Sequence, residues 1–192
     1  MLYRVHPEIY GSVQFNPSAG GDARFSPLLD ATGTAIPTIY AGTTLDCALM
    51  ETVFHDVPFA SGPKMLSKAT HVAGKVYSQL TLSRNLESID LSAIPLRKLG
   101  IPRNDLIECD GTQYSQTRAW AVALHAQYPN AEGLTWTSRQ ADPARALVLF
   151  GDRVAGSMFG VTASPTSLLL SDGSAILEVL ALAQRLGVLL TP

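Results

Sequence analysis

Apolar residues along the chain recur at two spacings, one typical of helices and the other of strands. In residues 45–56 (LDCALMETVFHD) apolar side chains recur every three or four positions, which predicts a helix with one buried face. Residues 114–128 and 175–186 show the same spacing and are also predicted to be helices. Pro129 and Gly187 follow these two segments, and both residue types favour the end of a helix.

Five shorter segments are typical of β-strands. Residues 146–150 (ALVLF) form a continuous apolar run, as expected of a central strand that is buried on both faces. Residues 37–42 and 134–138 are also predicted strands, the first closed by a glycine and the second alternating in residue type. Residues 70–77 and 86–91 complete the set.

Two stretches rich in glycine, proline and small polar residues, 15–37 and 92–112, are predicted to be irregular, the second with one helical turn. Strands and helices are mixed without a regular βαβ rhythm, and no glycine-rich nucleotide-binding motif is present. These observations predict the α+β class. We expect a single compact domain over residues 1–192, with a mixed or antiparallel sheet at its core and flanking helices.

Composition and charge exclude several classes of protein. The chain has 192 residues, 46% of them hydrophobic, which suffices for one buried core and is too apolar for intrinsic disorder. Its 14 Lys and Arg against 16 Asp and Glu give a net charge of −2, so direct binding to nucleic acid or to an anionic membrane is not expected. No apolar stretch is long enough to span a bilayer. With no secretory signal and only the isolated cysteines Cys47 and Cys109, we expect a cytoplasmic protein.

The chain lacks sequence motifs for metal binding or for a serine nucleophile. Its histidines show no metal-ligand spacing, so neither a metal nor a cofactor is expected. No G-x-S-x-G motif marks a nucleophilic serine. A small hydrolase that uses Ser138 with His55 or His125 remains one alternative.

Three polar residues stand out from apolar surroundings, and each also has a structural explanation. Arg24 lies in the loop segment ARFSP, where an arginine can brace the chain. Glu51 lies on the first predicted helix, away from its apolar stripe, where an exposed carboxylate can pair with His55 one turn later. Ser138 ends the predicted strand LTWTS, on the face of its apolar residues. Composition and spacing alone give none of the three a catalytic role.

Five motifs, in order along the chain, resemble the RES domain family. They are residues 2–5 (LYRV), 23–27 (ARFSP), 36–41 (IPTIYA), 48–55 (ALMETVFH) and 133–139 (GLTWTSR). The family is named for an Arg, a Glu and a Ser that are far apart in sequence, and the matching positions here are Arg24, Glu51 and Ser138. The resemblance covers about residues 2–151, so residues 152–192 are expected to form a C-terminal helical extension.

The resemblance implies a fold similar to that of ADP-ribosyltransferases and an activity on NAD⁺ as substrate. Proteins of this family are typically toxins of bacterial toxin–antitoxin pairs that degrade NAD⁺ by breaking the bond between nicotinamide and ribose, by hydrolysis or phosphorolysis. The implied partner is a helix-turn-helix antitoxin of the Xre type, and a homodimer of the toxin within that complex is a further expectation.

The resemblance also assigns roles to five side chains. Glu51 would stabilise the positive charge that develops on the ribose, and Arg24 would bind the pyrophosphate through its planar fork. Tyr40 would stack on the nicotinamide ring, and Ser138 would hydrogen-bond to the nicotinamide or the ribose. Arg4 would be a second phosphate contact, with a structural ion pair as the alternative.

Two further functions fit the same resemblance. The ADP-ribosyl group could pass to a macromolecule, which would make the protein an ADP-ribosyltransferase. The fold could also serve as a non-catalytic module that only binds a partner. The presence of Arg24, Tyr40, Glu51 and Ser138 together argues against the second of these, because a binding module has no need of the set.

Overall fold

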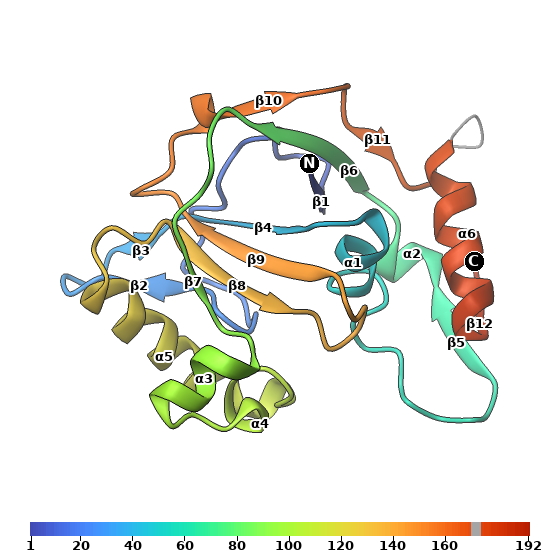
Figure 1. Cartoon of the computed structure of the whole chain (residues 1–192). Coiled ribbons are helices and arrows are strands. Elements are labelled where there is room, and N and C mark those ends of the chain that lie inside the picture. Colours follow the sequence, from blue (N-terminus) through green and yellow to red (C-terminus); the bar gives the residue numbers. More distant parts are fainter. Residues whose placement is uncertain (170–173) are drawn as a thin grey trace.

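The computed structural model describes residues 1–169 and 174–192, and its centre is an eight-stranded mixed sheet (Figure 1). Seven strands run in the order β10-β6-β1-β4-β9-β8-β7, and β11 also pairs with β6. Neighbours are antiparallel except β7 and β8, which are parallel. The strands are β1 (Leu2–Pro7), β4 (Thr38–Gly42), β6 (Lys75–Leu82), β7 (Ser88–Asp90), β8 (Gly133–Thr137), β9 (Arg145–Phe150), β10 (Phe159–Val161) and β11 (Thr166–Ser167).

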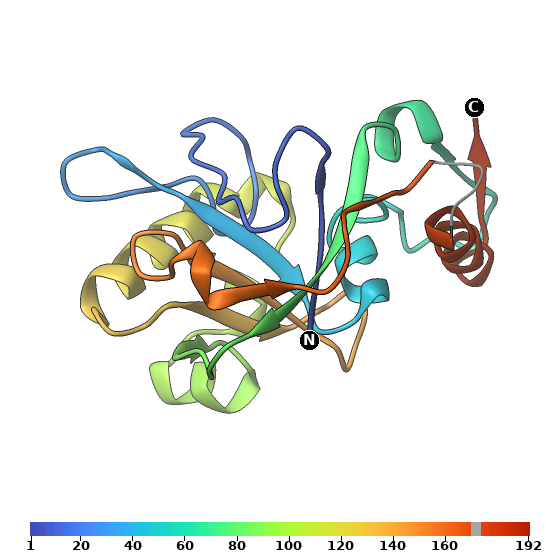
Figure 2. The same ribbon diagram turned by 90° about the horizontal axis from the view of Figure 1, so that it is seen from above.

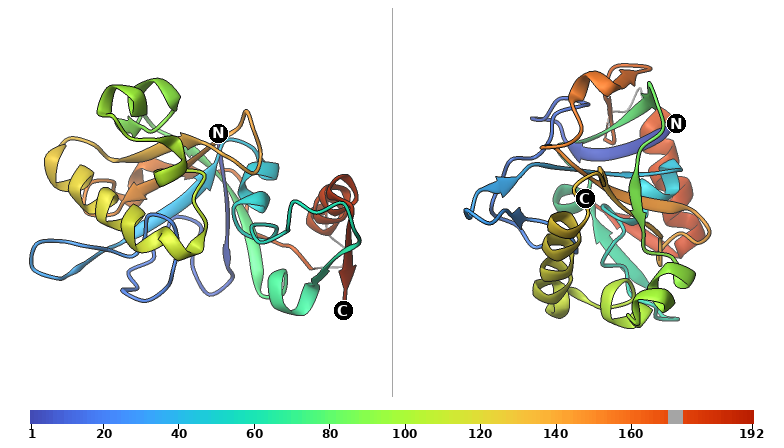
Figure 3. Two further views of the ribbon diagram at one scale, coloured as in Figure 1. Left: turned by 90° about the horizontal axis from the view of Figure 1, so that it is seen from below. Right: turned by 60° about the vertical axis from the view of Figure 1, so that its left-hand side comes forward.

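Helices flank this sheet, which confirms the predicted α+β class. Figure 1 shows α3, α4 and α5 together on one side of the molecule and α6 at the opposite end, and Figures 2 and 3 show the same separation. None of the helices in the described part of the chain is both long and apolar enough to cross a lipid bilayer. The helices are α1 (Leu45–Met50), α2 (Lys68–His71), α3 (Ala93–Leu99), α4 (Arg103–Leu106), α5 (Tyr114–Gln127) and α6 (Ser174–Leu186).

β9 is the central strand that its apolar run predicts. It pairs with β4 on one side and β8 on the other. Because side chains alternate between the faces of a strand, Val148 and Phe150 pack into the core cluster that includes Trp136 and Phe25. Leu147 and Leu149 pack into a separate cluster on the opposite face. Both faces of β9 are therefore buried.

β4 passes almost directly into α1 through a junction that requires glycine at position 42. A Cβ atom on Gly42 would lie 2.9 Å from the Ala48 backbone nitrogen and 3.0 Å from Cys47 Cβ. Thr44 then caps the helix, because its Oγ1 accepts a hydrogen bond from the Cys47 N–H at 3.1 Å. The end of β4 and the start of α1 are thus held together.

α1 ends at Met50 and not at residue 56 as predicted. The Thr52 hydroxyl donates to the Ala48 carbonyl at 2.6 Å, a local bond that competes with continuation of the helix. Glu51 is the C-cap residue, with φ −81° and ψ 0°. Its side chain therefore leaves the end of a helix, where the sequence predicts the middle of one.

Other predicted segments also differ from the structure. Residues 70–77 are not one strand, because α2 ends in a turn at Gly74 (φ +67°) that only then leads into β6. The stretch 92–112 contains α3 and α4, followed by a 3₁₀ turn, Gly111–Gln113. The stretch 15–37 contains a short antiparallel pair, β2 (Leu28–Leu29) and β3 (Ala35–Ile36).

The C-terminal segment 152–192 contains more than the predicted helix. β10 and β11 extend the main sheet by pairing with β6. After α6, β12 (Val188–Thr191) pairs in parallel with β5 (Lys64–Ser67) in a separate two-stranded sheet. Val179 and Leu182 of α6 pack in one cluster with residues of α1. The segment is therefore integrated with the rest of the fold.

Candidate functional site

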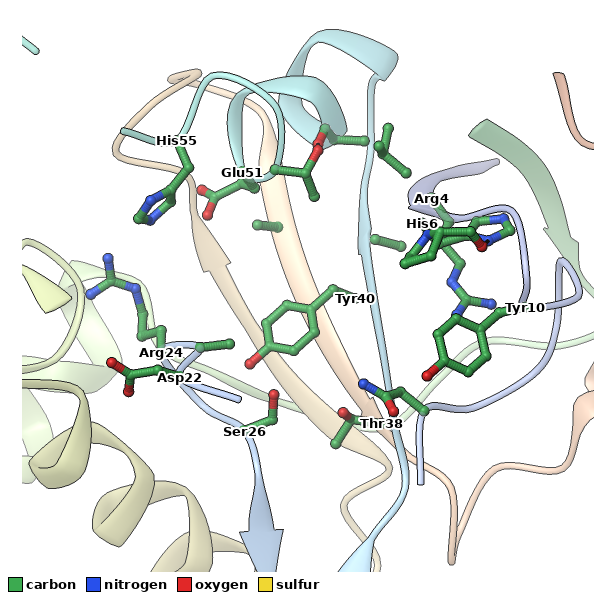
Figure 4. A pocket seen from close by; sticks show the side chains of 18 of the residues that line it. Arg4, His6, Tyr10, Asp22, Arg24, Ser26, Thr38, Tyr40, Glu51 and His55 are labelled. Atoms are coloured by element: carbon green, nitrogen blue, oxygen red, sulfur yellow. Dashed lines mark hydrogen bonds between the residues drawn. The ribbon is translucent and has the colours of Figure 1, made fainter. Parts of the chain in front are cut away.

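A cavity of about 400 Å³ lies beside β4 and α1 and brings together most of the residues predicted for the site. Arg4, Arg24, Tyr40 and Glu51 all line it. Figure 4 shows Glu51 and Tyr40 in its middle, Arg24 on one side and Arg4 on the other. Ser138 is not among the lining residues. The four lining side chains come from β1, the loop before β2, β4 and the end of α1.

Ser138 lies behind the cavity and supports Glu51 from there. Its Oγ donates a hydrogen bond to Glu51 Oε1 at 2.6 Å and accepts the N–H groups of Gln140 and Ala141, each at 3.1 Å. The residue is completely buried. The predicted contact of Ser138 with nicotinamide or ribose does not fit this position, because the hydroxyl is enclosed and its hydrogen is directed at Glu51. The bond orients the carboxylate from behind.

Tyr40 forms an aromatic wall next to Glu51. Its hydroxyl oxygen accepts the Phe25 N–H at 3.0 Å, and the edge of its ring meets Trp136 with ring centroids 6.4 Å apart. Burial raises the pKa of Tyr40 to about 12, so the phenol stays neutral at physiological pH. The ring is thus held in one position, as a stacking surface requires.

Arg24 is buried and already bound to the protein. Its NH1 group donates to the carbonyls of Leu106 and Cys109, both at 3.3 Å, and its NH2 group to the Tyr114 hydroxyl at 3.4 Å. The guanidinium also lies over the Tyr114 ring, 5.0 Å from its centroid. A two-pronged grip on a pyrophosphate would therefore require an exchange of these partners. In this structure Arg24 ties its loop to the chain between α4 and α5.

His55 does not form the predicted pair with Glu51. Its Nε2 lies 3.0 Å from the Tyr114 hydroxyl and its Nδ1 lies 2.8 Å from Asp56 Oδ1. Since α1 ends at Met50, Glu51 and His55 do not lie on consecutive turns of one helix. His55 still lines the cavity, on the same side as Arg24 (Figure 4).

On the other side of the cavity, Arg4 binds backbone carbonyls, and the ion pair considered for it is not found within residues 1–169 and 174–192. Its NH1 group donates to Gly11 O at 3.0 Å and to Ser12 O at 2.8 Å. Burial lowers the pKa of Arg4 to about 10, and Arg4 is therefore still a cation at neutral pH. Beside it, burial and the charge of Arg4 lower the pKa of His6 to about 4, so His6 is neutral.

The alternative of a serine hydrolase has no support in this geometry. Ser138 hydrogen-bonds to Glu51 and not to a histidine. His125 lies elsewhere, with its Nε2 2.9 Å from Asp152 Oδ2. Among the residues that the structure describes, no group of three or more His, Cys, Asp and Glu side chains could hold a metal ion.

Several residues that line the cavity have no predicted role from the sequence, among them Tyr10, His6 and Tyr114. Tyr10 lies in the loop after β1, next to Gly11, and an aromatic residue in such a loop was the one available signal. His6 and Tyr114 reach the cavity only through the packing of β1 and the start of α5. No local pattern distinguishes them from ordinary core residues.

Comparison with known proteins identifies relatives of this chain. The RES domain family matches residues 1–166. The fold is similar to a chain in the crystal structure of the M. tuberculosis MbcT–MbcA toxin–antitoxin complex, with a TM-score of 0.58 and 17% sequence identity. That alignment covers 97% of this chain and 87% of the other. A comparison with curated protein sequences found no match.

Proposed function

Because the chain belongs to the RES domain family, we propose that it is a toxin of a toxin–antitoxin pair that cleaves the bond between nicotinamide and ribose in NAD⁺. The observation that carries the proposal is the Glu51 carboxylate, which lines the cavity beside Tyr40 and is oriented by the buried Ser138 hydroxyl at 2.6 Å. A carboxylate held in this way suits a reaction in which positive charge develops on a sugar.

In the proposed reaction the bond between ribose C1′ and the nicotinamide nitrogen breaks, and its electron pair leaves with nicotinamide. The C1′ carbon becomes positively charged, and Glu51 stabilises this charge. An oxygen of water or of inorganic phosphate then bonds to C1′, and its proton passes to solvent. Because Ser138 fixes one carboxylate oxygen, Glu51 needs little reorganisation as the charge forms.

The other site residues bind and orient the substrate in this proposal. The Tyr40 ring provides the surface on which nicotinamide stacks. Arg24 holds the wall of the cavity that contains Tyr114, and its Nε has no hydrogen-bond partner in the described residues, so this group can face the substrate. Ser138 acts through Glu51 and is a positioning residue.

An antitoxin partner is also part of the proposal. Loss of NAD⁺ would harm the cell that makes the protein, so the cavity must be controlled. The solved structure with a similar fold is that of a toxin–antitoxin complex. We expect the partner of this chain to be a helix-turn-helix protein of the Xre type, which would also supply the DNA binding that a chain of net charge −2 does not favour.

The first test is incubation of the purified protein with NAD⁺ and measurement of nicotinamide release. We expect Glu51→Gln to lower turnover by about 10²-fold or more while the protein remains folded, because the charge that meets the reacting sugar is lost. Ser138→Ala should lower turnover less, because it removes orientation and keeps the charge.

Glu87→Gln is the matched control, since Glu87 is exposed and lies outside the cavity. Glu51→Gln turnover within about twofold of wild type would contradict the proposal. Product analysis with and without phosphate separates hydrolysis, which yields ADP-ribose, from phosphorolysis, which yields its phosphate ester. Transfer of the ADP-ribosyl group from labelled NAD⁺ to protein or nucleic acid would instead support an ADP-ribosyltransferase.

A further inference from the structure

Three side chains that line the cavity, Tyr114, His55 and Asp56, are joined in series by hydrogen bonds. The Tyr114 oxygen lies 3.0 Å from His55 Nε2, and His55 Nδ1 lies 2.8 Å from Asp56 Oδ1. Tyr114 begins α5 whereas His55 follows α1, so the contact joins segments 59 positions apart. Cleavage of the bond to nicotinamide needs a carboxylate at the ribose and does not by itself explain this series.

The direction of these hydrogen bonds follows from the groups on either side. An arginine can only donate, so the Tyr114 oxygen accepts the Arg24 NH2 group at 3.4 Å and its own hydrogen is free for His55 Nε2. The Asp56 carboxylate can only accept, so it takes the hydrogen on His55 Nδ1. Neutral His55 therefore presents the lone pair of Nε2 to the Tyr114 hydroxyl, in the geometry of a base beside the group that it deprotonates.

Exposure to solvent rises along the series from the cavity outwards. Tyr114 is 4% exposed, the His55 side chain 25% and the Asp56 side chain 84%. Burial raises the pKa of the Tyr114 hydroxyl, although the charges of Arg24 and Arg139 oppose this rise, so the hydroxyl keeps its proton at neutral pH. It can accept a proton from the cavity only while it passes its own to His55, from which a proton can reach solvent.

We infer that Tyr114 and His55 relay the proton of an attacking water molecule to solvent, so that this relay decides how well water competes as the acceptor. The inference rests on the proposed function, because the water attacks the sugar cation that Glu51 stabilises. Nicotinamide leaves on the Tyr40 side of Glu51, and the acceptor approaches C1′ from the other side, where His55 lies (Figure 4).

The proposed step balances without a further reactant. The water oxygen bonds to C1′ while one water proton moves to the Tyr114 oxygen and the Tyr114 proton moves to His55 Nε2. His55 becomes an imidazolium and then releases one proton to solvent on its exposed side. Inorganic phosphate already carries an anionic oxygen and needs no base. Loss of the relay should therefore slow hydrolysis and spare phosphorolysis.

The test lets water and inorganic phosphate compete in one reaction of the full chain with NAD⁺, and measures the ratio of ADP-ribose to its phosphate ester. We expect His55→Gln to lower this ratio at least tenfold, because a positioned general base contributes about 10²- to 10⁴-fold. Tyr114→Phe should lower it as much, since it keeps the ring under Arg24 and removes only the hydroxyl. A purely structural role would reduce both products alike and leave the ratio unchanged. If wild type forms no phosphate ester, azide replaces phosphate as the anionic acceptor.

His125→Gln is the matched control, because His125 also lies beside an aspartate, Asp152, but outside the cavity. It should leave the product ratio as in wild type. An unchanged ratio in His55→Gln and Tyr114→Phe would overturn the inference, and so would nicotinamide release by wild type that occurs only with an added anion. Both results would leave the proposed cleavage of NAD⁺ intact. No nicotinamide release by wild type with any acceptor would refute the proposed function and the inference with it.

Discussion

At the scale of single residues, His6 makes the stability of the fold depend on pH. Burial, and then the nearby charge of Arg4, lower its pKa from 6.5 to about 4. The unfolded chain therefore binds a proton near pH 6.5 that folded His6 binds only near pH 4. The stability from this residue is complete above pH 6.5 and is lost as the pH falls toward 4. We expect His6→Gln to flatten this part of the pH profile of the unfolding free energy, measured with urea. The control variant His71→Gln should leave the profile unchanged. An equally steep profile in His6→Gln would assign the dependence to other groups.

At the scale of elements, Arg24 connects the loop before β2 to the segment that leads from α4 into α5. Its bonds to Leu106, Cys109 and Tyr114 need a planar group with several donors, and a lysine ammonium cannot reproduce them. We expect Arg24→Lys to lower the unfolding free energy by about 1–3 kcal/mol. It should also reduce kcat/KM for NAD⁺ and for nicotinamide mononucleotide alike, because the wall of the cavity moves. Thermal unfolding and kinetics check this, with Arg97→Lys on α3 as the control. An unchanged Tm and an unchanged kcat/KM in Arg24→Lys would show that the bonds of the Arg24 guanidinium contribute neither to stability nor to activity.

At the scale of the whole molecule, the proposed activity predicts harm to the cell that makes the protein without its partner. We expect expression of wild type alone to stop growth with a fall in cellular NAD⁺, and Glu51→Gln at the same protein level to allow growth. Co-expression of a neutralising helix-turn-helix protein should restore growth. That partner should also reduce NAD⁺ cleavage by purified wild type, if it covers the cavity. Equal growth of cells that make either form would favour a binding module over an enzyme.

The structure shows which parts of the fold local sequence can predict. The apolar run of β9 and the spacing within α5 correctly predict a buried strand and a helix, because burial of both strand faces requires a continuous apolar run and burial of one helix face requires a helical repeat. The end of α1 is not predictable in this way, because the apolar spacing continues to residue 56 while the helix ends at Met50, where the Thr52 hydroxyl bonds to the Ala48 carbonyl. The pairing of β12 with β5 depends on contacts between segments more than a hundred residues apart, which no local period reveals.

For the site, the sequence by itself identified the residue types and their family, through the motifs around Arg24, Tyr40, Glu51 and Ser138. The tertiary structure alone decided what each side chain touches. Ser138 meets Glu51 across 87 positions of sequence, and Arg24 reaches Tyr114 across 90. Such contacts follow from how strands and helix ends pack together, and the spacing of residues along the chain carries no information about them. For the same reason, only the structure identifies Tyr10 as a cavity residue, because Tyr10 has no distinctive motif of its own. It lies in the loop after β1, which Arg4 holds through the carbonyls of Gly11 and Ser12.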